Sequence, residues 1–472
     1  MTRIHFRSDF QDVECRFRGT EGPPPPTLPS QDSGKTVGAY IVGAIVTAII
    51  AAIIQRQLSP SQAASQSSPP GSQPPPSPPG GVVPAPGATP ALPALRSGCS
   101  VPPIGETRFV SNEIILDIPA NVPTGTLDGI ASRHTMTRVE TTTLALTGRT
   151  LHRWRIDSGG SPEAMIRNVC GSEPARVVAG AQVNFLYVLA QQETAPVNAE
   201  QYAPQKLELP EAHRLATGSR VPIAVIDSEV DAAHPDLAGA ITANFDTSAD
   251  DERPHAHGTG MAGAIAARRS MLGAAPRSGL LTVRAFSSRA NTVEGTTFNI
   301  LKGLDWAAEH GARVVNMSFA GPSDPRLRDA LQKAYRKGIV LIAAVGNAGP
   351  NSPPLYPAAD PNVIAVTATD SDDRLFRGAN RGNYIAVSAP GVDILAPAPD
   401  GTYQLTTGTS VAAAEVSGIA ALLLERNPSL TPNQVRKILM DTAKDLGAKG
   451  RDRDYGAGLV NALKAVESAK PK

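Results

Sequence analysis

The chain has 472 residues, with 44 basic and 43 acidic side chains and a formal net charge of +1 at pH 7. This balance gives no general attraction to nucleic acid, and the length indicates two domains together with non-globular segments. The three cysteines, Cys15, Cys99 and Cys170, exclude a disulfide-dense scaffold, and no Cys/His cluster has zinc-ligand spacing.

Residues 37–54 (VGAYIVGAIVTAIIAAII) form a run of 18 residues without a charge, just long enough for a transmembrane helix. A cleaved signal peptide is the competing interpretation, but 36 residues precede the run. A buried globular helix fits poorly, because a proline-rich tract follows at once. Basic residues are more frequent in the tail 1–36 than directly after the run. We therefore expect a single-pass membrane protein whose amino terminus is cytoplasmic and whose remaining chain is periplasmic or extracellular.

Residues 55–98 are dominated by Pro, Ser, Gln, Gly and Ala. Such a tract buries no core, so we expect a disordered, extended linker between membrane and domain rather than a proline-rich recognition ligand. Export of the following residues would place Cys99 and Cys170 in an oxidising compartment, where they could pair, whereas Cys15 would stay reduced. Two unpaired structural thiols are an equal alternative.

Residues 105–190 predict a small domain. The expected elements, in order, are a strand at 109–119, a helix at 123–134, strands at about 137–147 and 150–157, a helix at 161–171 and a strand at 181–190. The order βαββαβ predicts an α+β ferredoxin-like sandwich.

From residue 200 to the end at 472, short apolar runs alternate with helical patterns, which predicts an α/β domain with a mostly parallel sheet. We expect strands at 221–227, 280–286, 312–319, 338–345, 362–369 and 384–389. We expect helices at about 257–268, 296–310, 324–337, 409–426 and 432–445. Ligands of such sheets bind at the carboxyl ends of the strands.

Three separated segments carry groups suited to acyl transfer: VIDSEVDAAHPDL at 225–237, HGTGMAG at 257–263 and GTSVAAAEVSG at 408–418. Ser410 would attack a carbonyl carbon, His257 would accept the serine proton, and Asp227 would orient the imidazole. Each residue also has an ordinary interpretation: a turn aspartate, a structural histidine, or a serine that caps a helix. Asn347, in AAVGNAGP, can donate its amide to the resulting oxyanion, with a turn asparagine as the alternative.

The order Asp…His…Ser, with these flanking residues, resembles the subtilisin-like serine proteases (subtilases) over about 200–466. The resemblance implies a doubly wound, mostly parallel sheet and a serine endopeptidase that acts on protein or peptide substrates through an acyl-enzyme. Subtilases carry an intramolecular chaperone and inhibitor propeptide before the catalytic region, where 105–190 lies. A small adaptor domain is the alternative for 105–190. We expect autoprocessing within the stretch 191–205.

The resemblance also implies the substrate contacts. Ser318, Phe319 and Ala320 match the segment that pairs with the substrate backbone and lines the primary specificity pocket. Ala344, Val345 and Gly346 would form the opposite wall, and Gly295, Thr296 and Thr297 a second extended strand beside the peptide. Ala320 stands where the family has glycine, so its methyl group is expected to narrow the pocket.

Several positions depart from the family pattern, namely Glu229, Gly260, Ala414 and Glu415, where Gly, His, Pro and His are usual. A buried Glu415 would need a partner. The segment 264–276 is shorter than in calcium-binding subtilisins and has Arg268 and Arg269 where oxygen ligands are expected. We therefore expect no metal ion and no cofactor. Two other functions compete with the peptidase: a catalytically silent subtilase-fold binding module, and an inhibitor of other proteases formed by 105–190.

Overall fold

The computed structural model describes residues 94–470, except 191, 194–200, 249–252 and 290–291. The expected cytoplasmic tail (1–36), membrane helix (37–54) and most of the linker (55–98) lie outside these residues. Among the helices that are described, none is both long and apolar enough to cross a bilayer.

The first part of the described chain has the predicted element order βαββαβ. The elements are β1 (Phe109–Asp117), α2 (Thr124–His134), β2 (Met136–Leu144), β3 (Arg149–Ile156), α3 (Pro162–Ser172) and β4 (Gly180–Leu189). The strands lie in the order β2-β3-β1-β4, and every neighbouring pair is antiparallel. This order is that of a ferredoxin-like sandwich. Ser161 caps α3 by accepting the Ala164 N–H, and Pro162 occupies the first helical turn.

Cys99 and Cys170, which are 71 positions apart in the sequence, form a disulfide. Of the two alternatives left open by the sequence, pairing is the one that the structure has. The bond joins the segment before β1 to α3.

The second part contains a seven-stranded parallel sheet in the order β15-β14-β13-β11-β6-β8-β7. Its strands are β6 (Pro222–Asp227), β7 (Ile241–Asp246), β8 (Gly279–Arg284), β11 (Val314–Met317), β13 (Val340–Ala344), β14 (Val363–Thr369) and β15 (Ile385–Pro390). Only the edge strand β7 was not predicted, because its exposed residues alternate with half-buried ones and give no continuous apolar run.

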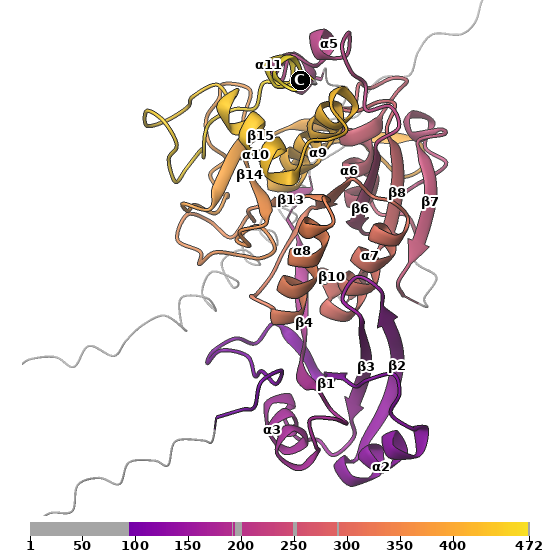
Figure 1. Cartoon of the computed structure of the whole chain (residues 1–472). Helices are drawn as coiled ribbons and strands as arrows, with labels where there is room; N and C mark the ends of the chain where they lie inside the picture. Colours follow the sequence, from indigo (N-terminus) through magenta and orange to yellow (C-terminus); the bar gives the residue numbers. More distant parts are fainter. Residues whose placement is uncertain (1–93, 191, 194–200, 249–252, 290–291, 471–472) are drawn as a thin grey trace, which may run out of the picture. The chain divides into compact units, whose positions relative to one another are not determined.

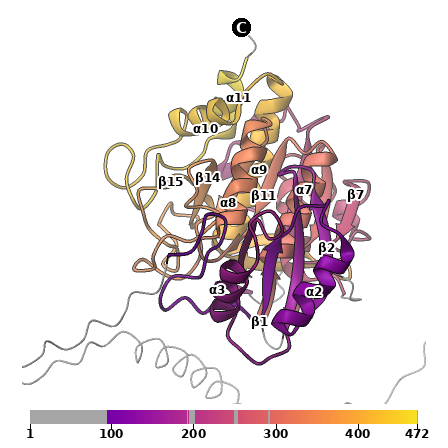
Figure 2. The same cartoon turned by 60° about the horizontal axis from the view of Figure 1, so that its bottom comes forward.

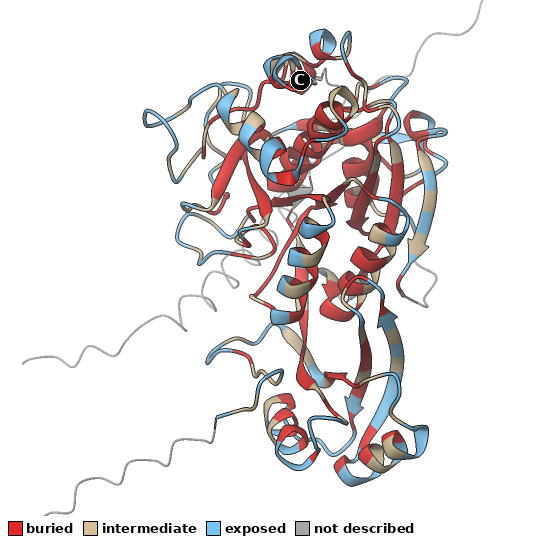
Figure 3. Ribbon diagram, viewed as in Figure 1, coloured by how far each residue is buried: buried red, intermediate tan, exposed pale blue. Residues whose placement is uncertain are grey.

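Helices cover both faces of this sheet, as Figure 1 shows. Along β6, Ala224 and Ile226 join the core on the α7 and α8 side, whereas Ile223 and Val225 join the core on the α6 and α9 side. The helices are α4 (Ala203–Lys206), α5 (Leu209–Ala212), α6 (Ala256–Ala266), α7 (Thr297–Glu309), α8 (Pro325–Arg336), α9 (Thr409–Arg426), α10 (Pro432–Asp441) and α11 (Ala462–Ser468), with a 3-10 turn at Pro235–Leu237. Burial on both faces explains the continuous apolar strands, drawn red in Figure 3. The doubly wound fold and the preceding α+β domain are confirmed.

Strand β4 pairs with strands of both the first and the second part of the described chain. On one edge it pairs with β1, and farther along it pairs with the antiparallel strands β10 (Thr292–Thr296) and β12 (Phe319–Ala320). Strand β9 (Phe286–Arg289) extends the sheet beyond β10. A separate three-stranded sheet contains β5 (Gln192–Glu193), β16 (Ile394–Ala398) and β17 (Thr402–Thr407). Figure 2 turns the small domain toward the viewer, with α2 and α3 in front.

Candidate active site

Asp227 and His257 are hydrogen-bonded at the carboxyl edge of the parallel sheet. Asp227 is the last residue of β6 and His257 the second residue of α6. The Oδ1 atom of Asp227 lies 2.6 Å from Nδ1 of His257 and also accepts the Ser228 backbone N–H at 2.8 Å. Because the carboxylate only accepts, Nδ1 carries the proton, and Nε2 is the ring nitrogen that can accept one. His257 Nε2 is buried and has no hydrogen-bond partner among the described residues.

Ser410 is the second residue of the buried helix α9, just after the N-cap Gly408. Its Oγ lies 2.5 Å from the carbonyl oxygen of Ala190 and 3.2 Å from that of Ser318. The helix-cap alternative for Ser410 is therefore wrong. The serine proton is directed at these carbonyl groups rather than at His257, so this structure lacks the Ser–His hydrogen bond that the sequence implied.

Asn347 lies in the loop after β13 and contacts the same carbonyl group as Ser410. Its Nδ2 donates to the oxygen of Ala190 at 2.6 Å. Its Oδ1 accepts the backbone N–H of Thr409 at 3.1 Å and the Thr409 hydroxyl at 2.9 Å. Because two donors hold Oδ1, the amide N–H group faces Ala190. The carbonyl oxygen of Ala190 is thus held between the predicted oxyanion donor and the predicted nucleophile.

Ala190 reaches this position because β4 lies as an extended strand between β10 and β12. Gly295 and Thr296 of β10 pair with Tyr187 and Leu186, and Phe319 and Ala320 of β12 pair with Leu189 and Val188. The Ala190 N–H then donates to the carbonyl oxygen of Ser318 at 3.2 Å. All five of these predicted contact residues therefore flank one peptide strand. This is peptide binding by strand addition.

The other predicted substrate contacts fall into two groups, the residues of the opposite pocket wall and Thr297. Ala344 ends β13, and Val345 and Gly346 follow it directly. Gly346 has a φ of +99°, and a methyl group on it would lie 3.4 Å from the Ala320 Cβ, so the two predicted pocket walls face each other closely. Thr297 does not extend the strand as predicted. It begins α7, with the Thr296 hydroxyl as the helix cap.

The departures from the family pattern are accommodated in different ways. Glu229 lies 3.6 Å from the guanidinium of Arg284. Gly260 lies in α6, where an added Cβ would meet Ala396 at 3.5 Å, in ordinary contact. Glu415 is 4 % exposed, and its Oε2 has no hydrogen-bond partner among the described residues. Burial raises the pKa of Glu415 well above its usual value and so favours the neutral form of this carboxyl.

The segment after α6 satisfies its own polar groups. Asp236 Oδ1 accepts the backbone N–H groups of Arg269, Ser270 and Met271 at 2.9, 2.7 and 3.1 Å. The Tyr403 hydroxyl donates to the other oxygen of Asp236 at 2.6 Å.

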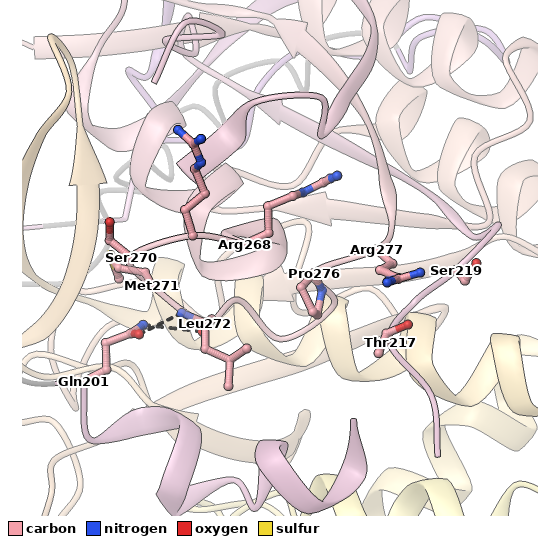
Figure 4. A pocket seen from close by; sticks show the side chains of 10 residues that line it. Gln201, Thr217, Ser219, Arg268, Ser270, Met271, Leu272, Pro276 and Arg277 are labelled. Carbon is pink, nitrogen blue, oxygen red and sulfur yellow. Dashed lines mark hydrogen bonds between the residues drawn. The ribbon is translucent and has the colours of Figure 1, made fainter. Parts of the chain in front are cut away.

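A cleft of about 810 Å³ lies beside this segment and is shown in Figure 4. Its wall includes Arg268, Arg269 and Arg277. The side chain of Gln201, also in the wall, accepts a hydrogen bond from the backbone N–H of Leu272 and donates one to its carbonyl oxygen. The three arginine side chains are cationic, and both oxygens of Asp236 already accept hydrogen bonds. This lining does not fit a calcium ion, which needs several free oxygen ligands. In the described residues no group of three or more His, Cys, Asp or Glu side chains could hold a metal ion.

Sequence reasoning missed the most informative residue of the site, Ala190. Because β4 was interpreted only as the last strand of the small domain, its end was not connected to Ser410. The signal was the position of VNFLYVLA immediately before the polar stretch 191–205. Strand β17 was also missed, and β10 was predicted only at its end, as the extended residues Gly295 and Thr296.

Comparison with known proteins identifies the same region. A model of the subtilase family matches residues 218–458, just over half of the chain. Thermitase of Thermoactinomyces vulgaris is 36% identical over 278 residues, which cover 57% of this chain and 97% of thermitase. Subtilisin of Bacillus pumilus is 38% identical over 278 residues, covering 56% of this chain and 98% of that protein.

A solved structure extends the likeness to the amino-terminal part. Fervidolysin from Fervidobacterium pennivorans, a keratinolytic enzyme related to subtilisin, matches with a TM-score of 0.67 and 24% sequence identity. The match covers 81% of this chain and 65% of fervidolysin, and it shows a shared fold alone. The family model, the two sequence relatives and the parallel sheet agree: the chain belongs to the subtilase family and is a subtilisin-like serine endopeptidase.

Proposed function

We propose that this endopeptidase works through Ser410 as nucleophile, His257 as general base and Asp227 as the group that orients the imidazole. One observation carries the proposal: the carbonyl oxygen of Ala190 lies 2.5 Å from Ser410 Oγ and 2.6 Å from Asn347 Nδ2. A peptide carbonyl is thereby bound against a hydroxyl and an amide donor, as acyl transfer requires.

The reaction needs one local movement. The Ser410 hydroxyl turns from the carbonyl oxygen of Ala190 toward Nε2 of His257 and gives it the proton as Oγ bonds to the carbonyl carbon. Asn347 stabilises the negative charge that develops on the carbonyl oxygen. The imidazolium, stabilised by Asp227, then protonates the leaving nitrogen when the carbon–nitrogen bond breaks. Water, deprotonated by His257, hydrolyses the resulting ester and restores Ser410.

The first substrate in this proposal is the chain itself. Ala190 is followed in sequence by Gln191, so attack at its carbonyl carbon would cleave the bond between them. The proposed processing site therefore lies at the start of the predicted stretch 191–205. Beyond the bond, Gln192 and Glu193 pair with Thr407 and Thr406 of β17. Strand pairing on both sides of the bond supports self-cleavage.

Residues 105–190 would then act as an intramolecular chaperone and inhibitor. Their contacts with helices α7 and α8 of the catalytic domain support this role. Asp305 of α7 accepts the backbone N–H groups of Leu146 and Ala145 at 2.6 and 3.1 Å. Lys333 of α8 donates to the carbonyl oxygen of Thr147 at 2.8 Å. These bonds hold the turn between β2 and β3 on the helices, while β4 fills the substrate cleft and keeps other peptides out.

The proposal further includes a membrane tether formed by residues 37–54. The uncharged 18-residue run and the basic residues before it support the tether, and a disulfide between Cys99 and Cys170 fits an oxidising compartment outside the cytoplasm. Deleting residues 1–54 should move the protein from the membrane fraction to the soluble fraction. A full-length protein that alkaline carbonate releases from membranes would contradict the tether.

A fluorophosphonate probe tests the nucleophile in the full chain after processing. Ser410→Ala should abolish both probe labelling and conversion of the precursor, whereas the exposed Ser429→Ala should leave both unchanged. Labelling of the Ser410→Ala protein at the wild-type rate would overturn the assignment.

A catalytically silent binding module is the second candidate. It is favoured by the missing hydrogen bond at His257 Nε2 and by the buried Glu415 within the serine helix α9. It predicts that wild-type protein freed of residues 105–190 does not react with the probe.

A further inference from the structure

The cleft of about 810 Å³ beside the segment after α6 has no role in the proposed catalysis. None of its lining residues belongs to the triad or to the predicted substrate contacts. Three of them are Arg268, Arg269 and Arg277, and we call this site the arginine cleft (Figure 4). Its volume lies within the range of roughly 300–1,000 Å³ that is usual for small-molecule sites.

The three arginines have no acidic partner among the described residues. The guanidinium of Arg268 donates only to the carbonyl oxygens of Gly239 and Ser278, at 3.2 and 3.4 Å. The side chains of Arg269 and Arg277 form no hydrogen bond or ion pair in the described part of the chain. Burial lowers the pKa of the Arg268 guanidinium, and the positive charge of Arg277 lowers it further. These two cations therefore repel each other, and an anion bound between them would relieve the repulsion.

The carboxylates next to the arginine cleft are occupied by backbone amides. Asp236 accepts three backbone N–H groups of 269–271, and Oε2 of Glu425 accepts the three backbone N–H groups of 217–219 at 2.6, 2.6 and 3.0 Å. These bonds hold the two loops that carry most of the lining. The guanidinium groups thus stand on a fixed backbone, and neither carboxylate forms an ion pair with them.

Two hydroxyl groups add further donors to the lining. Thr217 and Ser219 lie beside Arg277 in Figure 4, and the backbone N–H of Arg277 donates to the carbonyl oxygen of Thr217 at 2.9 Å. Neither hydroxyl has a hydrogen-bond partner among the described residues. Unused hydroxyl donors beside guanidinium groups are the combination that binds oxyanions through charge-assisted hydrogen bonds.

We propose that the arginine cleft binds a small molecule that carries phosphate groups. A phosphate has three acceptor oxygens and a charge of about −1.5 to −2 at pH 7, so one group can accept from two guanidinium forks and balance both. A carboxylate has two oxygens and a single charge, and would leave two of the three arginines without a counter-ion. The third arginine suits a second phosphate group, as in a pyrophosphate.

The proposal also assigns the ligand a structural effect. The lining comes from three separate segments: Gln201 after the proposed cleavage site, the loop with Thr217 and Ser219, and the loop 268–277. A ligand that contacts all three binds only the folded domain, so it should raise the Tm.

The test uses the full chain in non-ionic detergent, with Ser410→Ala to prevent self-digestion. Calorimetric titration at constant ionic strength compares inorganic phosphate, inorganic pyrophosphate and glycerol 3-phosphate, the headgroup of a phosphatidic acid. We expect pyrophosphate to bind at least about 10-fold more tightly than phosphate, because a second group adds charge-assisted hydrogen bonds. Glycerol 3-phosphate that binds as tightly as pyrophosphate supports a lipid headgroup as the source of the phosphate, and weaker binding supports a soluble diphosphate.

Variants assign the binding to the residues named. Arg269→Gln and Arg277→Gln remove exposed side chains that have no partner in the described protein, so both should fold normally. Each should weaken pyrophosphate binding about 10- to 100-fold. Arg277→Lys keeps the charge without the planar fork and should cause a smaller loss. Arg336→Gln, the matched control at the exposed end of α8, should bind pyrophosphate like the parent protein.

Two results would overturn the site. One is the absence of binding and of any rise in Tm with millimolar pyrophosphate. The other is an equal loss of affinity in Arg336→Gln and Arg277→Gln, which would show general attraction to a positive surface. Because every protein carries Ser410→Ala, neither result bears on the proposed triad.

Discussion

Asn347 donates its side-chain amide to the carbonyl oxygen of Ala190 at 2.6 Å, although the two residues are 157 positions apart in the chain. The contact connects the catalytic domain to the last residue of the preceding strand. It joins a group suited to stabilising an oxyanion to the carbonyl group on which an oxyanion would form, which supports the proposal that the chain is its own first substrate.

The contact predicts how Asn347→Ala should behave. In subtilisin, a relative of this chain, removing the asparagine that donates to the oxyanion lowers kcat by about 10²–10³. We expect conversion of the precursor to slow by a similar factor, with little change in KM for peptides, and the rates are measured by gel and by peptide hydrolysis. Asn362→Ala, in a turn capped by Asp360, is the matched control. Unchanged kcat in the Asn347 variant would contradict the role.

Cleavage between Ala190 and Gln191 predicts the mass of the mature enzyme, whose first residue should be Gln191. A larger side chain at 190 should slow processing, because the methyl group of Ala320 lies close to Gly346 on the opposite wall. We expect Ala190→Leu to accumulate precursor and the added change Ala320→Gly to restore part of the rate. Intact-mass measurement over time checks both. A mature protein that starts elsewhere would refute the assigned bond.

The burial of Glu415 predicts that the free energy of unfolding depends on pH. Burial raises its pKa in the folded state, so the folded state binds more protons than the unfolded state above the ordinary value of 4.5. The free energy of unfolding should therefore be fully retained below that pH and fall as the pH rises, by at most about 1.4 kcal/mol per unit.

Glu415→Gln should remove this dependence and stabilise the protein at neutral pH. Denaturant unfolding in a Ser410→Ala background, which prevents self-digestion, measures the effect. Glu467→Gln, an exposed change on α11, should retain the wild-type dependence. Parallel pH profiles for wild type and the Glu415 variant would show that the carboxyl is ionised in the fold.

The burial of His152 predicts the opposite pH dependence of stability for the amino-terminal domain. Burial, assisted by Arg138 and opposed by Asp117, lowers the pKa of His152 from 6.5 to about 4. The folded state then binds fewer protons, so stability is present above pH 6.5 and is lost as the pH falls toward 4. The loss is at most about 1.4 kcal/mol per pH unit.

Hydrogen exchange of β2 and β3 should accelerate across this pH range in wild-type precursor, but not in His152→Gln. His310→Gln, at the exposed end of α7, serves as control. Exchange that is insensitive to pH in both proteins would exclude His152 as the titrating group.

The parts of the site that could be predicted are those encoded in short segments. Asp227 ends an apolar strand, His257 opens a glycine-rich helix and Ser410 opens a long apolar helix, and local periodicity is enough to place all three. Thr297 shows the limit of the family resemblance, which implied an extended strand over Gly295–Thr297. The helix that the local pattern predicted at about 296–310 is present instead: the Thr296 hydroxyl caps a helix that begins at Thr297.

By itself the sequence determined the chemistry and the architecture, because residue types, their order and the spacing of apolar residues are local properties that folding preserves. The pairing of β4 with β10 and β12, the contact of Ala190 with Ser410 and the burial of Tyr187 against Phe319 were decided only by the tertiary structure. These contacts join segments more than 100 residues apart, and no local pattern encodes which distant strand completes a sheet. Their energy comes from hydrogen bonds and apolar surface that exist only when both partners are folded together.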